Sequence, residues 1–521
     1  MRVLKTVIVL AFAVILIARS ADAQPAQLPP AAGSQPPDTV DVTLDGAIAR
    51  AINVSEEMQL AKADVDEAET RITAAKSQAL PQVNASSSYT RLFRSGFSQG
   101  IDLRVPDALR FNPNPNLPLE QRVAYLEQNA GSAVLTTLGD LLTSALQNVG
   151  LGSPHLYNVN LSASQLLYAG GRVSAEIEIY KNVRDAARFN YREQGSDVEL
   201  NIRTSYYRAL LAQELESIAQ AALVQAETFL RQERTRLQAG FASDLDVMRA
   251  EVSLETLRPQ AVDARNARSL ALLDLKRLIN LPLEQPIRLT TSLDVPTGTA
   301  LTDTRLAPEK LTAERPAVLA VEKQVAAREQ QVHATRAGYL PSVSLQASYG
   351  GQIVPSGIVD FSNASWTPLG TLMVGVQVPI FNGFRKGADI GQAQVQLRQT
   401  QLKEIQLRES VQLQYDQALG ERENARAAIA ARQRTVDQAQ RVYDLLLLGY
   451  EQGASTQLDV SSARLSLFQA RTNLAQALSD FYIADARVLR AVGSTTVPVP
   501  SSPSPAPPPP AGSTVADRPG R

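Results

Sequence analysis

The stretches that decide the fold are LQAGFASDLDV at residues 237–247 and YEQGASTQLDV at residues 450–460. With Gly240 aligned on Gly453, the two phrases stand 213 residues apart and end in the same Leu-Asp-Val. A phrase that recurs this closely predicts that a larger unit of the chain is used twice.

The same offset holds far upstream of the two phrases. It places Arg172 on Arg385 and Asp246 on Asp459, so both segments keep register from the arginine to the aspartate. We interpret the chain as an internal two-fold sequence repeat.

Each copy is predicted to contain a very long helical hairpin. Neither copy has a proline between the shared arginine and the tip glycine. At about 1.5 Å per residue such a segment makes a rod of roughly 100 Å. The glycine permits positive φ and a cheap chain reversal. The hairpins are expected over residues 172–281 and 385–493.

A heptad-like seam runs along the first long helix, at Leu215, Ala219, Ala222, Ala226 and Phe229. The offset places its counterpart at Ala428, Thr435, Ala439 and Val442. Narrow, Ala-rich seams suit close side-by-side packing of helices.

Two strand-like runs precede each long helix, at 82–92 and 157–168 in the first copy and at 342–353 and 371–381 in the second. Apolar and small polar residues alternate in them. This pattern is typical of membrane β-barrels and equally of half-buried antiparallel sheets. Single-chain barrels need at least about eight strands, so four per chain favour a barrel shared by three chains.

A helix is predicted before each strand pair, over residues 43–79 and 315–338, and each ends at a Leu-Pro pair. Pro81 and Pro341 are 260 residues apart, which exceeds the tip offset by 47. The difference lies between the two strands of each copy, where the first loop is the longer.

The longer loop, residues 93–156, is predicted to have structure of its own. It contains an amphipathic piece at 121–148, which fits one or two helices. On the outer face of a barrel this loop would narrow the exit.

The N-terminus predicts export. Arg2 and Lys5 precede the apolar run TVIVLAFAVILIA, and Ala21 and Ala23 suit a cleavage site. The run is short for a membrane span, so a signal peptide is favoured over an anchor.

The expected organisation follows from these segments. It comprises a signal peptide (1–23), a Pro-rich segment (24–40), the first repeat (41–281), a link between the repeats (282–314), the second repeat (315–495) and a disordered Pro-rich tail (496–521).

Composition excludes several function classes. The chain of 521 residues has no Cys and only two His, which argues against thiol chemistry and a metal centre. Lys plus Arg is 51 against 52 for Asp plus Glu, so nucleic acid is not an expected partner. No motif of a catalytic site is present, and we expect neither catalytic residues nor a cofactor.

Six passages resemble the TolC family of outer-membrane efflux proteins. They are VTLDGAIARAI at 42–52, the two Leu-Pro junctions, QVPIFNGFRKG at 377–387, and the two tip phrases. The resemblance covers residues 40–495, nearly the whole chain that follows the signal peptide.

The resemblance implies an α+β membrane channel. In this family a homotrimer forms a 12-stranded β-barrel in outer-membrane lipid, continued by a long periplasmic α-helical barrel. The implied function is passive export of small molecules. The implied partners are a periplasmic adaptor protein and an inner-membrane pump of the resistance-nodulation-division or ABC type.

The resemblance also implies a gate at the periplasmic mouth. Asp459 and Tyr450 match gate residues, and Asp246 matches their partner in the first copy. Ser455 and Ser462 depart from a gate arginine and a second gate aspartate. In a trimer the two aspartates would place six carboxylates around one opening, where like charges raise one another's pKa and attract cations.

The tip turns themselves resemble the adaptor-docking surface. The residues implied are Gly240, Phe241, Ser243, Leu245, Val247, Gly453, Thr456, Leu458 and Val460. The alternative is turn chemistry alone, in which Ser243 and Thr456 cap the returning helices and the aspartates favour their N-termini.

Aromatic residues near the strand ends are predicted to lie at the membrane interface, at Tyr89, Tyr157, Tyr349 and Trp366. Packing at the barrel–helix junction is an equal alternative for Tyr168 and Phe381.

Three other functions stay open at this point. A type I protein-secretion duct would use the same channel. A periplasmic coiled-coil adaptor also has long hairpins, but one hairpin rather than two. A secreted enzyme is the third, although no site for it is visible.

Overall fold

The computed structural model describes residues 39–91, 93, 111–148, 155–295, 307–354 and 365–493. The predicted signal peptide, the Pro-rich residues before 39 and the predicted tail lie outside the described residues. The predicted Pro-rich segment ends earlier than expected, because Val40 already begins a strand.

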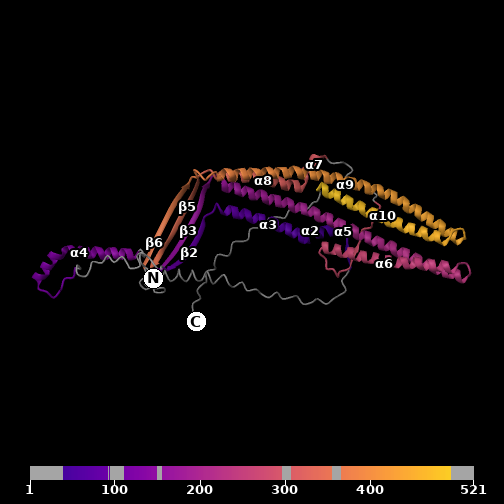
Figure 1. Ribbon diagram of the computed structural model, residues 1–521, viewed down its shortest axis with the longest axis horizontal. Coiled ribbons are helices and arrows are strands. Elements are labelled where there is room, and N and C mark those ends of the chain that lie inside the picture. The colour runs from indigo at the N-terminus through magenta and orange to yellow at the C-terminus, as the bar shows by residue number, and fades with distance from the viewer. Residues whose placement is uncertain are drawn as a thin grey trace, which may run out of the picture.

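The molecule is elongated (Figure 1). A four-stranded sheet lies between a set of long helices and a single separate helix, α4 (Leu119–Asn148). The amphipathic piece of the long loop thus forms one continuous helix rather than two.

The sheet has the order β2-β3-β5-β6, and all of its neighbours are antiparallel. Its strands are β2 (Gln82–Arg91), β3 (His155–Ala169), β5 (Ser342–Val354) and β6 (Ser365–Gln377). The prediction of 371–381 for the last strand is wrong at both ends. Pro379 has no N–H to donate to the ladder, which is a physical reason for β6 to end before it.

The register gives the sheet two different faces. Val83 pairs with Ala163, which pairs with Ala347, and that residue pairs with Leu372. Because paired residues share a face, apolar residues of all four strands lie on one side. Their sequence neighbours, mostly Ser, Asn and Gln, lie on the other.

Two helices of equal length leave the sheet. α5 (Arg172–Gln238) and α9 (Arg385–Glu451) contain 67 residues each. Each starts after a left-handed residue, Gly171 or Phe384. The returning helices are α6 (Asp244–Leu278) and α10 (Gln457–Val492).

The predicted helix 43–79 is wrong as a single element. Ser55 has extended backbone angles and separates α2 (Leu44–Val54) from α3 (Glu56–Ser77). Its Oγ accepts from the Met58 N–H at 3.4 Å, so a side-chain cap starts the second helix. The later counterpart, α8 (Pro316–Ala337), is unbroken.

The link between the two halves is more ordered than predicted. It contains α7 (Pro308–Glu314) and β4 (Ile287–Leu289), which pairs in parallel with β1 (Val40–Val42). Ile287 and Leu289 are buried in the largest core cluster. Burial of these apolar side chains stabilises the small sheet against α5, and Tyr206 there donates to the Val42 carbonyl at 3.0 Å.

The seam prediction holds for α5 and in part for α9. On α5, Ala219, Ala222, Ala226 and Phe229 are buried. On α9, Ala428 and Ala439 pack against core clusters. Thr435 and Val442 are exposed, and Tyr443 is buried in place of Val442. Tyrosine rings bury far more area than Thr or Val, and they determine which face turns inward.

A buried guanidinium fastens three helices where α8 begins. Arg315 is 1% exposed and binds Glu193 of α5 at 2.7 Å. Its Nη1 also donates to the carbonyls of Arg490 and Ala491, at 2.6 and 2.7 Å, near the end of α10. It therefore adds a charged donor to carbonyls of the last helical turn, where intrahelical partners run out.

Arg315→Ala is expected to lower the free energy of unfolding by about 3 kcal/mol, because the partly buried Glu193 carboxylate and two carbonyls each lose a charged donor. Urea denaturation followed by circular dichroism measures the change. Arg487→Ala is the control, since its pair with Glu421 is half exposed and is worth less than about 1 kcal/mol. Equal losses in the two variants would contradict the assignment.

Candidate functional site at the hairpin tips

Each hairpin turns at a glycine whose backbone only glycine adopts readily. Gly240 has φ 79° and Gly453 has φ 76°. A Cβ at either position would meet no atom within 4 Å, so the backbone angle and not space explains the residue. The Phe241 and Ala454 amides then close the helix ends on carbonyls of α5 and α9, at 2.8 and 2.7 Å.

Reciprocal hydrogen bonds start both returning helices. Ser243 Oγ accepts from the Asp246 N–H at 3.2 Å, and the Asp246 carboxylate accepts from the Ser243 N–H at 3.1 Å. Thr456 and Asp459 make the same pair of bonds, at 3.2 and 3.0 Å. Both sites are capping boxes, which confirms the expected capping by Ser243 and Thr456.

These caps set the charge of the two aspartates. Hydrogen bonds from Ser243 lower the pKa of Asp246, and those from Thr456 lower the pKa of Asp459. Within one protomer the shift is opposite to the rise expected for a ring of carboxylates. The local donors therefore favour the ionised form of both carboxylates.

Tyr450 lies inside the tip rather than on it. Its side chain is 9% exposed, and its hydroxyl donates to Glu233 Oε2 at 2.7 Å. Burial, and then this bond to a carboxylate, raise the pKa of Tyr450. The guanidinium of Arg236 lies 4.5 Å from the ring centroid, within cation–π range.

Glu233 is the residue that sequence reasoning missed. It is 1% exposed, and its Oε1 has no partner among the described residues. The seam residues Ala226 and Phe229 step by three, and a further step of four reaches Glu233. Ionisable residues are rarely buried in a helix seam, so the position of Glu233 in the seam was the sequence signal that could have identified it.

The two hairpins are joined at their tips. Gln457 of α10 donates to the Asp246 carbonyl of α6 at 2.7 Å. A core cluster formed by all four helices includes Leu230, Leu254, Tyr450 and the fully buried Val460. The tips consequently pack as one body.

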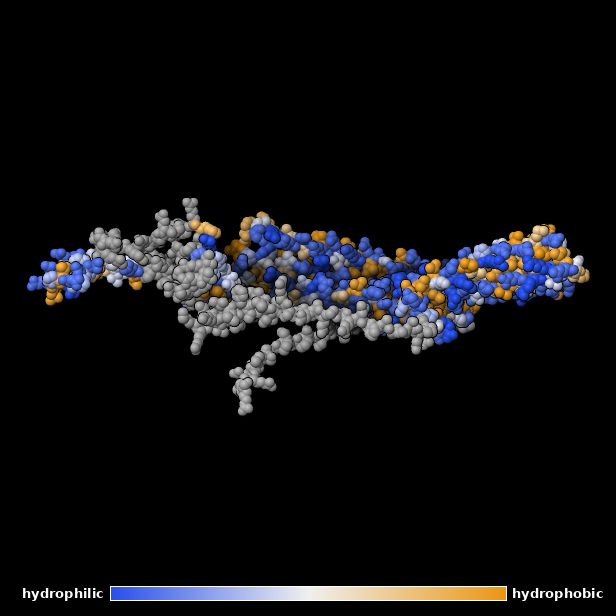
Figure 2. Space-filling view, turned by 90° about the horizontal axis from the view of Figure 1, so that it is seen from below, coloured by the Kyte–Doolittle hydropathy of each residue, from blue (hydrophilic) through white to orange (hydrophobic). Residues whose placement is uncertain are grey.

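The predicted docking residues separate into two groups. Phe241, Leu245 and Leu458 are exposed, Phe241 at 77%, and Figure 2 shows apolar surface at this end of the molecule. Val460 is wrong as a docking residue because it belongs to the core, and Val247 packs against the same cluster.

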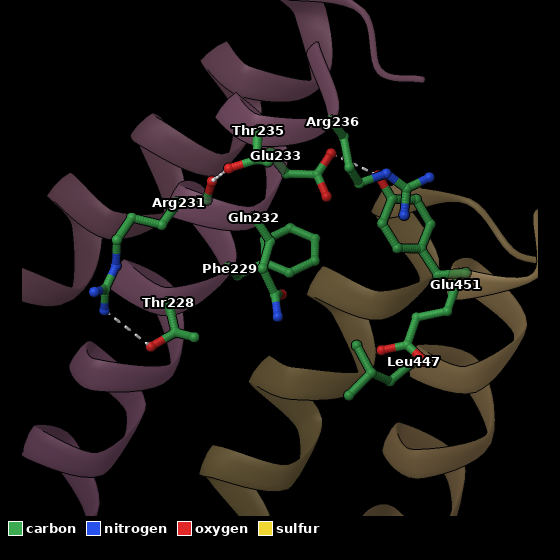
Figure 3. Close-up of a pocket in the computed structure, with 10 residues that line it drawn as sticks. Thr228, Phe229, Arg231, Gln232, Glu233, Thr235, Arg236, Leu447 and Glu451 are labelled. Carbon is green, nitrogen blue, oxygen red and sulfur yellow. Dashed lines mark hydrogen bonds between the residues drawn. The ribbon is translucent and has the colours of Figure 1, made fainter. Parts of the chain in front are cut away.

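A pocket of about 520 Å³ lies between α5 and α9 behind the tips (Figure 3). Arg231, Glu233 and Arg236 line it from α5, and Leu447, Tyr450 and Glu451 line it from α9. Its walls mix apolar and charged groups.

The strand aromatics gather at the far end of the sheet. Tyr89 pairs with Tyr157, Tyr157 with Ile353, and Ile353 with Trp366, so the four positions form one row. The Tyr89 and Tyr157 rings are 4.8 Å apart. Tyr349 is exposed on the same face, four residues from Ile353.

Other chemistry is sparse in the described part of the chain. No group of three or more His, Asp or Glu side chains there could hold a metal ion. No helix within the described ranges is both long and apolar enough to cross a membrane.

Tyr450→Phe is expected to destabilise the tips by about 1–3 kcal/mol, because Glu233 loses its hydrogen bond while staying buried. Hydrogen exchange of residues 440–451 would report it as faster opening. Replacing both partners, in Tyr450→Phe with Glu233→Leu, should recover most of the protection. A double variant worse than the single one would contradict this account.

Known proteins resemble this chain in sequence and architecture. The family model "Outer membrane efflux protein" matches residues 47–281 and 307–494. The outer membrane efflux protein BepC of Brucella suis biovar 1 (strain 1330) is 26% identical over 345 residues, 65% of this chain and 72% of that protein. The pyoverdine export outer membrane protein OpmQ of Pseudomonas putida (strain KT2440) is 27% identical over 357 residues, 65% of this chain and 70% of that protein.

The fold itself matches a solved channel. A crystal structure of CusC superposes with a TM-score of 0.66 at 20% identity, covering 88% of this chain and 93% of that one. The matched family model covers most of the chain, including both helical hairpins and the sheet. The protein belongs to the outer membrane efflux protein family, and its place is the outer membrane, with the long helices extending into the periplasm.

Proposed function

We propose that three copies of the chain form one continuous duct, which carries small molecules passively from the periplasm to the exterior. The observation that carries the proposal is a sheet with one apolar face and two edge strands that have no partner among the described residues. Such a sheet is stable in a membrane only when other copies complete it.

The strand order suits closure by identical copies. β2 and β6 are the edges of an antiparallel sheet with an even number of strands. β6 of one copy therefore meets β2 of the next in antiparallel orientation, and the alternation continues around the ring. Three copies supply twelve strands, an even number within the range of known barrels.

The height of the apolar face agrees with a membrane. On β6 it runs from Trp366 to Val376, which at about 3.4 Å per residue is roughly 34 Å. A strand tilt of about 40° reduces the height to roughly 26 Å, close to the band of about 25 Å in outer-membrane barrels. The row of Tyr89, Tyr157 and Trp366 then lies at the outer interface.

The helices continue the duct. α5 and α9, each about 100 Å long, run from the inner end of the sheet with α6 and α10 packed on them. Three copies would enclose an α-helical barrel through the periplasm. Its mouth would be ringed by the tips, with Asp246, Tyr450 and Asp459 near the opening.

The exposed tip residues Phe241, Leu245 and Leu458 are suited to an adaptor protein. Apolar side chains around a polar turn give a partner a small hydrophobic anchor. Energy would come from an inner-membrane pump, because the proposed transport through the duct is passive. The pyoverdine export named for a relative supports small-molecule cargo.

Leu372→Arg is expected to cost about 2–4 kcal/mol per chain and to deplete the trimer from outer-membrane fractions, because the side chain faces lipid. Thr371→Arg is the matched control. It is the sequence neighbour on the polar face, where Ser348 bonds it at 2.6 Å, and it should assemble with altered conductance. Normal assembly of the Leu372 variant, measured by heat-resistant bands, would refute the barrel.

Asp459→Asn is expected to weaken the cation preference of the channel, measured as a reversal potential in planar bilayers. Asparagine keeps an oxygen for the Thr456 cap and removes the charge. Because hydrogen bonds from Thr456 lower the pKa of Asp459, the wild-type preference should persist as pH falls through the ordinary titration range of an Asp carboxyl and be lost only in more acidic solution. Asp263→Asn, exposed in the middle of α6, is the control. Unchanged cation selectivity would show that Asp459 does not lie at the mouth of the channel.

A further inference from the structure

The helix α4 carries an apolar stripe whose side chains are exposed. In its first half the stripe consists of Leu119, Val123, Leu126 and Ala130, which step by four, three and four. All four are exposed, Leu119 at 73%. This spacing is that of a coiled-coil seam rather than of a helix in solvent.

The stripe continues along the second half of the helix. Val134, Leu138 and Leu141 step by four and three, and all are exposed, Val134 at 67%. The step of four from Ala130 to Val134 is one residue longer than a strict heptad allows, so the stripe drifts slightly around the helix axis. From Leu119 to Leu141 the stripe is roughly 33 Å long.

The polar side of α4 is the side that its own chain covers. The Phe111 N–H donates to Thr136 Oγ1 and the Asn112 N–H to the Tyr125 hydroxyl, both at 3.3 Å. The rings of Phe111 and Tyr125 lie 5.8 Å apart. The preceding segment therefore binds the polar face and leaves the apolar face open.

The charges beside the stripe indicate that its partner is a second copy of α4. With Val123 as an a position and Leu126 as a d position, Arg122 is a g residue and Glu127 is the following e residue. In parallel coiled coils a g residue faces the e residue five positions later on the neighbouring helix. Two copies of α4 side by side thus bring opposite charges together.

A lipid surface fits these residues poorly. Helices that lie on membranes carry Lys and Arg on the polar face. The charged residues of α4 are Glu120, Arg122, Glu127 and Asp140, of which only one is basic. The helix projects beyond the end of the sheet that lies opposite the long helices (Figure 1).

We infer that the α4 helices of three copies pack against one another in parallel through the Leu119–Leu141 stripe, forming a helical collar above the outer mouth of the barrel. The inference rests on the proposed trimer. This packing buries the apolar stripe away from water, and it makes the exit narrower than the barrel beneath it.

Single cysteines test the collar, because the chain contains none. Val134→Cys in the full-length trimer should yield disulfide-linked dimers on mild oxidation. Gln128→Cys, on the opposite face of the same helix, is the matched control. Since a disulfide requires Cα atoms within about 7 Å, the yield should differ by about tenfold or more.

Charge reversal tests the parallel register. In the Val134→Cys background, Arg122→Glu should reduce cross-linking severalfold through repulsion with Glu127. Adding Glu127→Arg should restore the yield, which a lipid-bound helix would not do. Size-exclusion chromatography with light scattering establishes the trimer separately.

The outcomes separate the two proposals. An intact trimer in which Val134→Cys cross-links no better than Gln128→Cys overturns the collar and leaves the proposed channel standing. If Val134→Cys is then shielded from a water-soluble maleimide, lipid is the occupant. Absence of any trimer overturns the proposed channel, and the collar with it.

Discussion

The unpaired backbone of two edge strands is the constraint on which the rest of the molecule depends. β2 and β6 each have a partner on one side, and the face they share with β3 and β5 is apolar. In lipid an unpaired peptide group costs several kcal/mol, so in the proposed channel this sheet needs other copies beside it.

Sequence was a good guide where one local cause dominates. The tip glycines, the capping residues and the two long helices follow from backbone angle, side-chain hydrogen bonds and the absence of proline. Prediction failed where distant contacts decide. The break at Ser55 and the order in the link depend on packing against α5. The inward face of α9 is set by Tyr443 and Tyr450, which an offset copied from α5 could not reveal.

The candidate site shows the same division. The sequence correctly predicted that Asp246 and Asp459 lie at the tips. In the structure both side chains cap the returning helices. Tyr450 was singled out by resemblance, whereas its partner Glu233 became visible only when α5 and α9 were brought together. Membership of the outer membrane efflux family decides against a free-standing periplasmic adaptor, a reading that the hairpins alone would have allowed.

The bond between Gln457 and the Asp246 carbonyl has a mechanical consequence. Together with the shared core around Val460, this bond makes the ends of the two hairpins one rigid unit. Separating one hairpin from the other would expose an apolar interior to water. In the proposed trimer, moving both hairpins together against the next subunit would keep that interior buried, so widening of the duct would cost least along the boundaries between subunits.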